Sequence, residues 1–178
     1  MSKRVLIISS SPRKNGNSDT LCHSFAHGAK ENGNEVIEIF TNNKEIHYCK
    51  GCGYCSSHDG CCQHDDMAEI IDEIMKSDVI VFSSPIYFYS ISGQLKTLID
   101  RLVAVYTKIS SKEIYYIFAA AENGKNTFSR AAACIDGLCD CLSNVQVKGI
   151  IAAGGVWNKG AVDNTKYIQQ AYDMGYAV

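Results

Sequence analysis

The chain has little proline and tryptophan, no long hydrophobic run and no excess of charge of one sign. Its 178 residues include two prolines and one tryptophan, and 17 basic residues face 19 acidic ones for a net charge of −2. Without a basic stripe, no nucleic-acid partner is expected. The apolar runs are too short to span a bilayer, so no membrane partner is expected. The first run, residues 5–8, is also too short for a secretory signal, which predicts a cytoplasmic protein.

Two phosphate-binding motifs are also missing. The sequence has no G-x-x-x-x-G-K followed by Ser or Thr, which excludes an ATP or GTP P-loop. It has no G-x-G-x-x-G, and the second expected strand leads into Thr41, Asn42 and Asn43 rather than into an acidic residue that could bind a ribose. A dinucleotide site of the Rossmann kind is therefore not expected as the primary site.

Short β-rich runs alternate with helical patterns along the chain. A continuous apolar run such as residues 4–9 is typical of a parallel strand buried on both faces, and apolar residues at i, i+3, i+4 and i+7 predict a helix. Five strands each followed by a helix imply an α/β fold, a five-stranded parallel sheet with helices on both faces, in one domain over residues 1–178. Strands are expected at 4–9, 36–40, 79–83, 114–120 and 147–153, and helices at 18–31, 65–76, 95–102, 128–142 and 162–175.

Nine cysteines make up about 5% of the chain, below the roughly 8–10% of a disulfide scaffold. In a cytoplasm they are expected to stay reduced, where a tight cysteine cluster indicates metal binding or redox chemistry. Five of the nine lie in the irregular stretch 41–64. A loop of that length inside a compact domain is usually functional, so we expect this cysteine-rich loop to be a site.

The loop after the first expected strand, residues 9–18, has the features of a phosphate site. It is rich in hydroxyl and amide side chains, includes Arg13 and Lys14, and runs into a helix N-terminus. Backbone N–H groups and the helix dipole attract an anion at such an end, and Arg13 can add a charge-assisted contact. Asn17 or Ser18 is expected to cap the helix. The alternative is a polar turn that caps a helix and binds nothing.

Residues 83–96, after the third expected strand, contain three consecutive aromatic residues, Tyr87, Phe88 and Tyr89. In open α/β sheets, ligands bind beyond the carboxyl ends of the strands, where these rings could stack on a flat apolar ring system. Core packing or a subunit interface would use the same side chains. Beside a phosphate loop, the rings favour a phosphorylated aromatic cofactor, and flavin mononucleotide (FMN) has one phosphate, one ring system and one ribityl linker.

Two motifs, residues 11–18 and residues 85–101, together resemble those of the NADPH-dependent FMN reductase family of flavodoxin-like proteins. The resemblance implies a flavodoxin-like three-layer sandwich with strand order 2-1-3-4-5, non-covalent FMN, and a homodimer or homotetramer with the flavin near the interface. It also implies a set of cofactor-binding residues. These are Ser11, Arg13, Asn17, Ser18 and Thr20 for the phosphate, and Pro85, Ile86, Tyr87, Phe88, Tyr89, Ser90, Ala121 and Glu122 for the ring.

The cysteine-rich loop contains a C-x2-C-x2-C motif, which three thiolates could use to wrap one face of a cubane cluster. The spacing resembles that of iron–sulfur flavoproteins, a branch of the same family with four closely spaced cysteines in this loop. Zinc held by three cysteines and Cys61, His58 or His64 is an alternative, as are a thiol redox switch and free thiols. The resemblance implies a 4Fe-4S cluster held by Cys49, Cys52, Cys55 and Cys61.

The sequence is thus interpreted as an FMN-dependent NAD(P)H oxidoreductase of the flavin- or quinone-reductase type. NAD(P)H would give hydride to the flavin, and a small-molecule or protein electron acceptor would take the electrons in turn. No catalytic side chain is expected, because flavin hydride transfer does not demand a protein acid. One alternative is an iron–sulfur flavoprotein that carries electrons to and from a ferredoxin-like partner. Another is a sensing module in which the cysteine-rich loop reports redox state.

Overall fold

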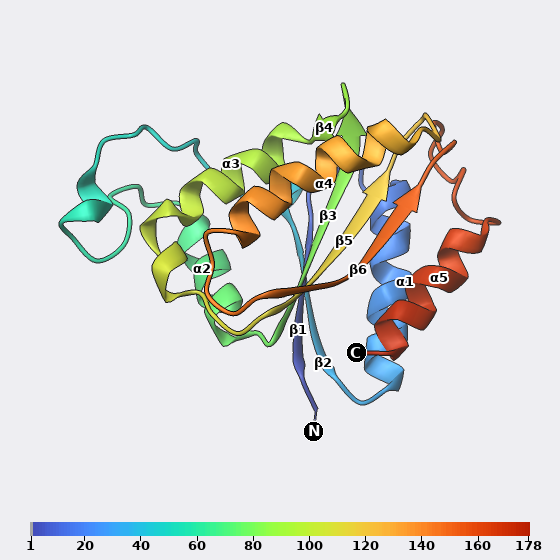
Figure 1. Ribbon diagram of the computed structural model, residues 1–178, viewed down its shortest axis with the longest axis horizontal. Helices are drawn as coiled ribbons and strands as arrows, with labels where there is room; N and C mark the ends of the chain where they lie inside the picture. Colours follow the sequence, from blue (N-terminus) through green and yellow to red (C-terminus); the bar gives the residue numbers. More distant parts are fainter. Residues whose placement is uncertain (1) are drawn as a thin grey trace.

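The computed structural model describes residues 2–178, which form a twisted parallel sheet with helices on both faces (Figure 1). The strand order β2-β1-β3-β5-β6 confirms the expected flavodoxin-like order, because it reads 2-1-3-4-5 when only the parallel strands are counted. These parallel strands are β1 (Arg4–Ser9), β2 (Glu35–Phe40), β3 (Val79–Tyr87), β5 (Glu113–Ala119) and β6 (Gln146–Ala153).

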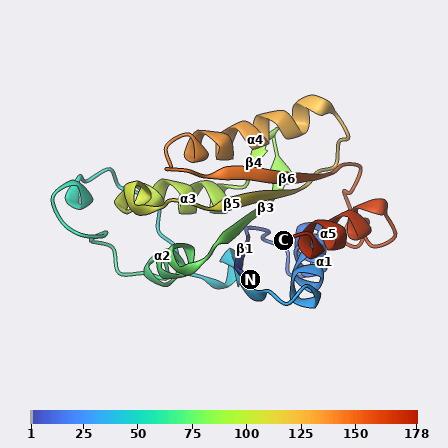
Figure 2. The same cartoon turned by 60° about the horizontal axis from the view of Figure 1, so that its bottom comes forward.

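Five helices cover the sheet from both sides, as the view in Figure 2 makes plain. Helices α1 and α5 pack on one face, and α2, α3 and α4 pack on the other, each face having its own hydrophobic core. The expected three-layer sandwich is therefore confirmed. The helices are α1 (Asn17–Glu31), α2 (Met67–Lys76), α3 (Gly93–Arg101), α4 (Lys125–Cys139) and α5 (Lys166–Tyr176).

The two cores explain why β1 is apolar along its whole length. Successive side chains of a strand point to opposite faces of the sheet. Leu6 and Ile8 accordingly pack with α2, α3 and α4, whereas Val5 and Ile7 pack with α1 and α5, and all four are at most 1% exposed. A central strand buried on both faces cannot show the apolar–polar alternation of a half-exposed strand.

Several expected boundaries were wrong by a few residues. Strand β3 continues past residue 83 to Tyr87 and folds back as a short antiparallel strand, β4 (Ser90–Ile91), through a turn at Phe88 and Tyr89. Helix α5 begins at 166 instead of 162, because Thr165 caps it by accepting a hydrogen bond from Tyr167 N. Helix α2 begins at 67 instead of 65, and α4 spans 125–139 instead of 128–142.

The stretch 41–64 is irregular, as expected, apart from short 3-10 turns at Thr41–Asn43 and Tyr54–Ser56. It projects from the molecule beside α2 and α3 (Figure 1). Within residues 2–178, no helix is long and apolar enough to cross a membrane.

Helices α1 and α5 approach each other closely because glycines lie at their contact. A Cβ on Gly28 of α1 would lie 2.1 Å from the Tyr172 carbonyl oxygen, and one on Gly175 of α5 would lie 2.0 Å from the Phe25 carbonyl oxygen. Both neighbours are backbone atoms, which cannot rotate away. By contrast, a Cβ on Gly137 in α4 would meet nothing within 4 Å.

Gly28→Ala should therefore lower the free energy of unfolding by about 1–3 kcal/mol, because α1 and α5 must separate to admit the methyl group. Gly137→Ala is the matched control and should raise it by roughly 0.5–1 kcal/mol, since alanine favours an open helical position. Urea denaturation of both variants measures the difference. Equal effects of the two substitutions would contradict the close packing of α1 on α5.

Candidate active site

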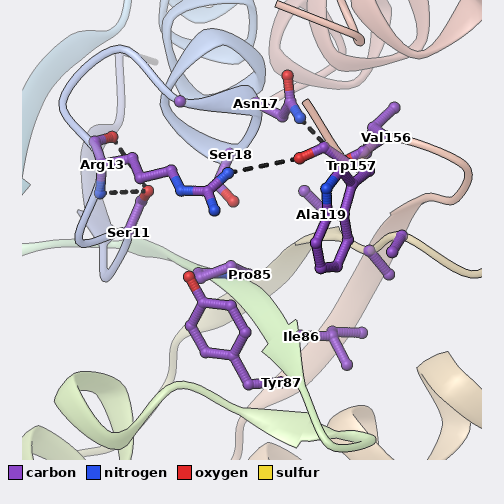
Figure 3. A pocket seen from close by; sticks show the side chains of 13 residues that line it. Ser11, Arg13, Asn17, Ser18, Pro85, Ile86, Tyr87, Ala119, Val156 and Trp157 are labelled. Carbon is purple, nitrogen blue, oxygen red and sulfur yellow. Dashed lines mark hydrogen bonds between the residues drawn. The ribbon is translucent and has the colours of Figure 1, made fainter. Parts of the chain in front are cut away.

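A cleft of about 130 Å³ lies beyond the carboxyl ends of the parallel strands (Figure 3). It brings together the loop after β1, the end of β3 and the loops after β5 and β6. Eight of the expected cofactor-binding residues line it, from three separate segments of the chain. They are Ser11, Arg13, Asn17, Ser18, Pro85, Ile86, Tyr87 and Ala121.

Buried serines hold the loop after β1 against the end of β3. The Ser10 hydroxyl donates to the Ser83 carbonyl at 2.7 Å, and the Ser92 hydroxyl donates to Ser10 Oγ at 2.8 Å. Ser92 also caps α3 by accepting a hydrogen bond from Leu95 N. Two walls of the cleft are therefore fixed to each other by hydrogen bonds between groups that are shielded from water.

The N-terminus of α1 opens toward the cleft with Gly16 as its N-cap, and no side chain of the described residues caps it. The expected cap by Asn17 or Ser18 is thus wrong, because the Asn17 side chain turns toward the loop after β6. A Cβ on Gly16 would lie 2.9 Å from the Arg13 carbonyl oxygen, so this tight turn requires glycine. Uncapped N–H groups at a helix start are suited to an anion.

Below this turn, Asp19 holds the loop after β1 in shape. Its carboxylate accepts hydrogen bonds from Ser9 Oγ at 2.5 Å and from Asn15 N at 3.0 Å. Burial raises the pKa of Asp19, and the two hydrogen bonds oppose that rise in part.

The loop after β6 forms a wall of the cleft that the sequence analysis missed. Asn17 Nδ2 donates to the carbonyl oxygens of Val156 and Asn158, each at 2.9 Å, and Arg13 Nη1 lies 3.4 Å from the Trp157 carbonyl oxygen. The Trp157 side chain lines the cleft and is 70% exposed. The signal was available, since the lone tryptophan of the chain follows the last strand at the same sheet edge.

Five expected cofactor-binding residues lie near the cleft without lining it. Phe88 is fully exposed at the tip of the β3–β4 turn. Tyr89 Oη donates to Glu122 Oε1 at 3.3 Å, which raises the pKa of Tyr89. Thr20 Oγ1 donates to the Gly16 carbonyl at 3.2 Å, and Ser90 Oγ lies 3.6 Å from Cys134 Sγ.

The four expected ligand cysteines, Cys49, Cys52, Cys55 and Cys61, line a second cavity of about 260 Å³. All nine cysteines are free thiols. Among the residues described, no three His, Cys, Asp or Glu side chains lie close enough to hold one metal ion together. The four thiols thus line one cavity and are the kind of ligand that a sulfur-ligated metal centre requires. Their sulfur atoms are too far apart in this structure to bind one metal ion together.

A buried ion pair anchors the cysteine-rich loop to α3. The Arg101 guanidinium donates to both carboxylate oxygens of Asp65, at 2.6 and 3.0 Å, and to the His47 carbonyl at 2.8 Å. Both side chains are at most 2% exposed. Burial acts to raise the pKa of Asp65, but hydrogen bonds from Arg101, His47 N and Met67 N outweigh it and lower the pKa to about 2. Nothing in the sequence pattern alone indicates this pair.

Helix α3 spans the distance between the two sites. Its N-cap, Ser92, is bonded to the loop that lines the cleft, and its last residue, Arg101, lines the cysteine cavity. Nine residues at 1.5 Å each give the helix a length of roughly 13 Å.

Comparison with known proteins identifies relatives of the larger part of the chain. The sequence profile of the NADPH-dependent FMN reductase family matches residues 3–135. An iron–sulfur flavoprotein of Archaeoglobus fulgidus is 36% identical over 96 residues, which are 54% of this chain and 44% of that protein. One of Methanosarcina thermophila is 39% identical over 105 residues, 59% of this chain and 55% of that protein. The matched region thus spans about half the length of these relatives.

Solved structures share the fold. An NAD(P)H:quinone oxidoreductase from Methanothermobacter marburgensis aligns with a TM-score of 0.79 and 18% identity, covering 99% of this chain and 96% of that one. A flavone reductase aligns with a TM-score of 0.74 and 22% identity, covering 97% of this chain and 60% of that one. At this level of identity the likeness concerns the fold alone.

The Asp65–Arg101 pair should make stability depend on pH in acid. A carboxyl whose pKa is lower in the folded than in the unfolded chain stabilises the fold above the unfolded value, and this contribution is lost as the pH falls through the folded value. With a folded pKa of about 2 against the ordinary 3.8, the wild-type chain should lose about 2 kcal/mol between roughly pH 4 and pH 2.

Asp65→Asn cannot titrate, so its unfolding free energy should fall less over this range, although the variant starts lower because Arg101 is left buried and unpaired. Urea denaturation of both proteins at several pH values gives the comparison. Asp72, an exposed carboxylate of α2, supplies the control variant Asp72→Asn, whose unfolding free energy should fall with pH as steeply as that of the wild type. If the unfolding free energy of Asp65→Asn fell with pH as steeply as that of the wild type, the low pKa assigned to Asp65 would be contradicted.

Proposed function

The chain belongs to the NADPH-dependent FMN reductase family, and on that premise we propose that it is an FMN-dependent NAD(P)H oxidoreductase of the flavin- or quinone-reductase type. The observation that carries the proposal is the composition of the cleft. An uncapped helix start and the Arg13 guanidinium lie on one side, and Pro85, Ile86 and Tyr87 lie on the other. One end suits a phosphate, and the other suits a flat ring system.

FMN fits this division of the cleft. Ser11, Arg13 and Ser18, with the N–H groups at the start of α1, would hold the phosphate by charge-assisted and neutral hydrogen bonds. Tyr87 and Trp157 present partly exposed aromatic rings for stacking. Asn17 would act indirectly, by holding the loop that carries Trp157.

When bound, FMN would supply the redox chemistry: it would take hydride from NAD(P)H and pass the electrons to a small-molecule or protein acceptor. The chain's own task would be to orient the ring and to stabilise negative charge on it. Backbone N–H groups of the loops at Tyr87 and Ala121 are the donors that we assign to this role. No side chain is assigned as a catalytic acid. We further expect a single cytoplasmic FMN-binding domain that works as a homodimer or homotetramer.

Arg13→Gln should weaken FMN binding roughly 10- to 100-fold, because a hydrogen bond to a charged group contributes about 1.5–3 kcal/mol. Riboflavin lacks the phosphate, so its affinity should change little. Fluorescence titration of the flavin-free full chain with each compound measures both affinities. Anaerobic addition of NADPH or NADH to the FMN-loaded wild-type protein should then bleach the visible absorption of the flavin.

Lys14→Gln is the matched control, because Lys14 is the neighbouring cation and does not line the cleft. Its FMN affinity should stay within a few-fold of that of the wild type. If Arg13→Gln lost as much affinity for riboflavin as for FMN, Arg13 would not be a phosphate ligand. A wild-type chain that takes up no FMN would overturn the proposed function.

The second candidate function is that of an iron–sulfur flavoprotein that exchanges single electrons with a ferredoxin-like partner. It is favoured by the four cysteines that line one cavity and by the relatives named iron–sulfur flavoproteins. Cys49, Cys52, Cys55 and Cys61 would hold a 4Fe-4S cluster there. The Arg101 guanidinium, which also lines this cavity, would place a positive charge beside the sulfur ligands.

Anaerobic reconstitution with iron and sulfide tests this candidate. The wild-type chain should retain about four irons and four sulfides, and Cys55→Ser should retain far less. Cys141→Ser removes an exposed thiol outside this cavity and should behave as the wild type does. Equal iron in all three proteins, or no iron in the wild type, would contradict a cluster held by these four cysteines. Neither result would bear on the FMN proposal.

A further inference from the structure

Cys62 is the one cysteine of the loop that does not line the cysteine cavity. Its Sγ lies 3.8 Å from Cys52 Sγ, and both side chains are exposed. Its neighbour in sequence, Cys61, is half-buried and lines the cavity with Cys49, Cys52 and Cys55. Cys52 therefore belongs to two groups of thiols. It is one of the four that line the cavity, and it also forms a solvent-exposed pair with Cys62.

The backbone around this pair is rich in glycine. Gly51, Gly53 and Gly60 adopt left-handed conformations with φ of 62°, 71° and 83°. A Cβ on Gly51 or Gly60 would meet nothing within 4 Å, so neither residue is held by packing. The two sulfur atoms must approach to about 2.05 Å to bond. A glycine-rich loop outside the sheet can supply that shift without disturbing either core.

We propose that Cys52 and Cys62 form a redox-active dithiol that low-molecular-weight disulfides oxidise to a disulfide within the loop. One thiol loses its proton to solvent, and its thiolate attacks a sulfur of the small disulfide, breaking that S–S bond and releasing one small thiolate. The second cysteine, after losing its proton, attacks the mixed disulfide and releases the other small thiolate. The two cysteines are oxidised by two electrons, and the small disulfide is reduced to two thiols.

The disulfide would take Cys52 out of the set that lines the cavity. A sulfur bonded to Cys62 is no longer a thiolate, and only thiolates ligate metals well. Oxidation of the pair and metal binding by the four cavity cysteines are therefore mutually exclusive states of the loop. The dithiol itself depends on neither FMN nor a cluster, so the proposal goes beyond the function proposed above.

The test uses the full chain, prepared metal-free and reduced, freed of reductant without oxygen and treated with oxidised glutathione. After alkylation of the remaining thiols, mass spectrometry should show two fewer alkylated cysteines than in the untreated chain and no retained glutathione. Peptide mapping should link Cys52 to Cys62. In Cys62→Ser the second attack is lost, so glutathione should remain attached to Cys52.

Cys61→Ser is the matched control, since it removes the adjacent thiol but keeps the pair. After treatment with oxidised glutathione, this variant should show two fewer alkylated cysteines than its untreated form and should retain no glutathione, as the wild type does. The proposal is overturned if the wild type does not react, if its linked peptide joins Cys52 to Cys61, or if Cys61→Ser and not Cys62→Ser retains glutathione. Titration of the same samples with FMN reports on the flavin site separately.

Discussion

Parallel pairing of β1, β3, β5 and β6 is the constraint on which the candidate site depends. Parallel strands all point the same way, so the loops that follow them meet at one edge of the sheet. Residues as distant in sequence as Arg13, Tyr87 and Trp157 therefore line one cleft. The two cores make this arrangement rigid, because each face of the central strands is covered by its own set of helices.

Helix α3 extends this order to the cysteine-rich loop. At its start, Ser92 is hydrogen-bonded to Ser10 in the loop after β1, and at its end Arg101 holds Asp65 and the His47 backbone. A long irregular segment would otherwise have few contacts with the sheet. The buried ion pair fixes both ends of the cysteine-containing stretch, while the glycine-rich part between them is largely exposed to solvent.

Much of the fold and part of the site could be predicted from the sequence. The loop after β1 and residues 85–87 were recognisable as segments that line the cleft, because short motifs at strand ends have a local physical meaning. Trp157 was missed because the loop that carries it becomes part of the cleft through hydrogen bonds from Asn17, about 140 residues away. Phe88 and Tyr89 were expected in the lining, but the β3–β4 turn directs them outward, and a two-residue strand leaves little periodic signal.

The sequence by itself determined the α/β class, a parallel sheet with helices on both faces and the cysteine motif, because hydrophobic periodicity and residue spacing are local properties, whereas the strand order was implied only by the family resemblance. Only the tertiary structure decided which loops share the cleft, that α1 begins uncapped, and that Cys52 lies between the cavity and Cys62. Those features depend on contacts between segments far apart in the chain, and such contacts exist only once the sheet has brought the segments together.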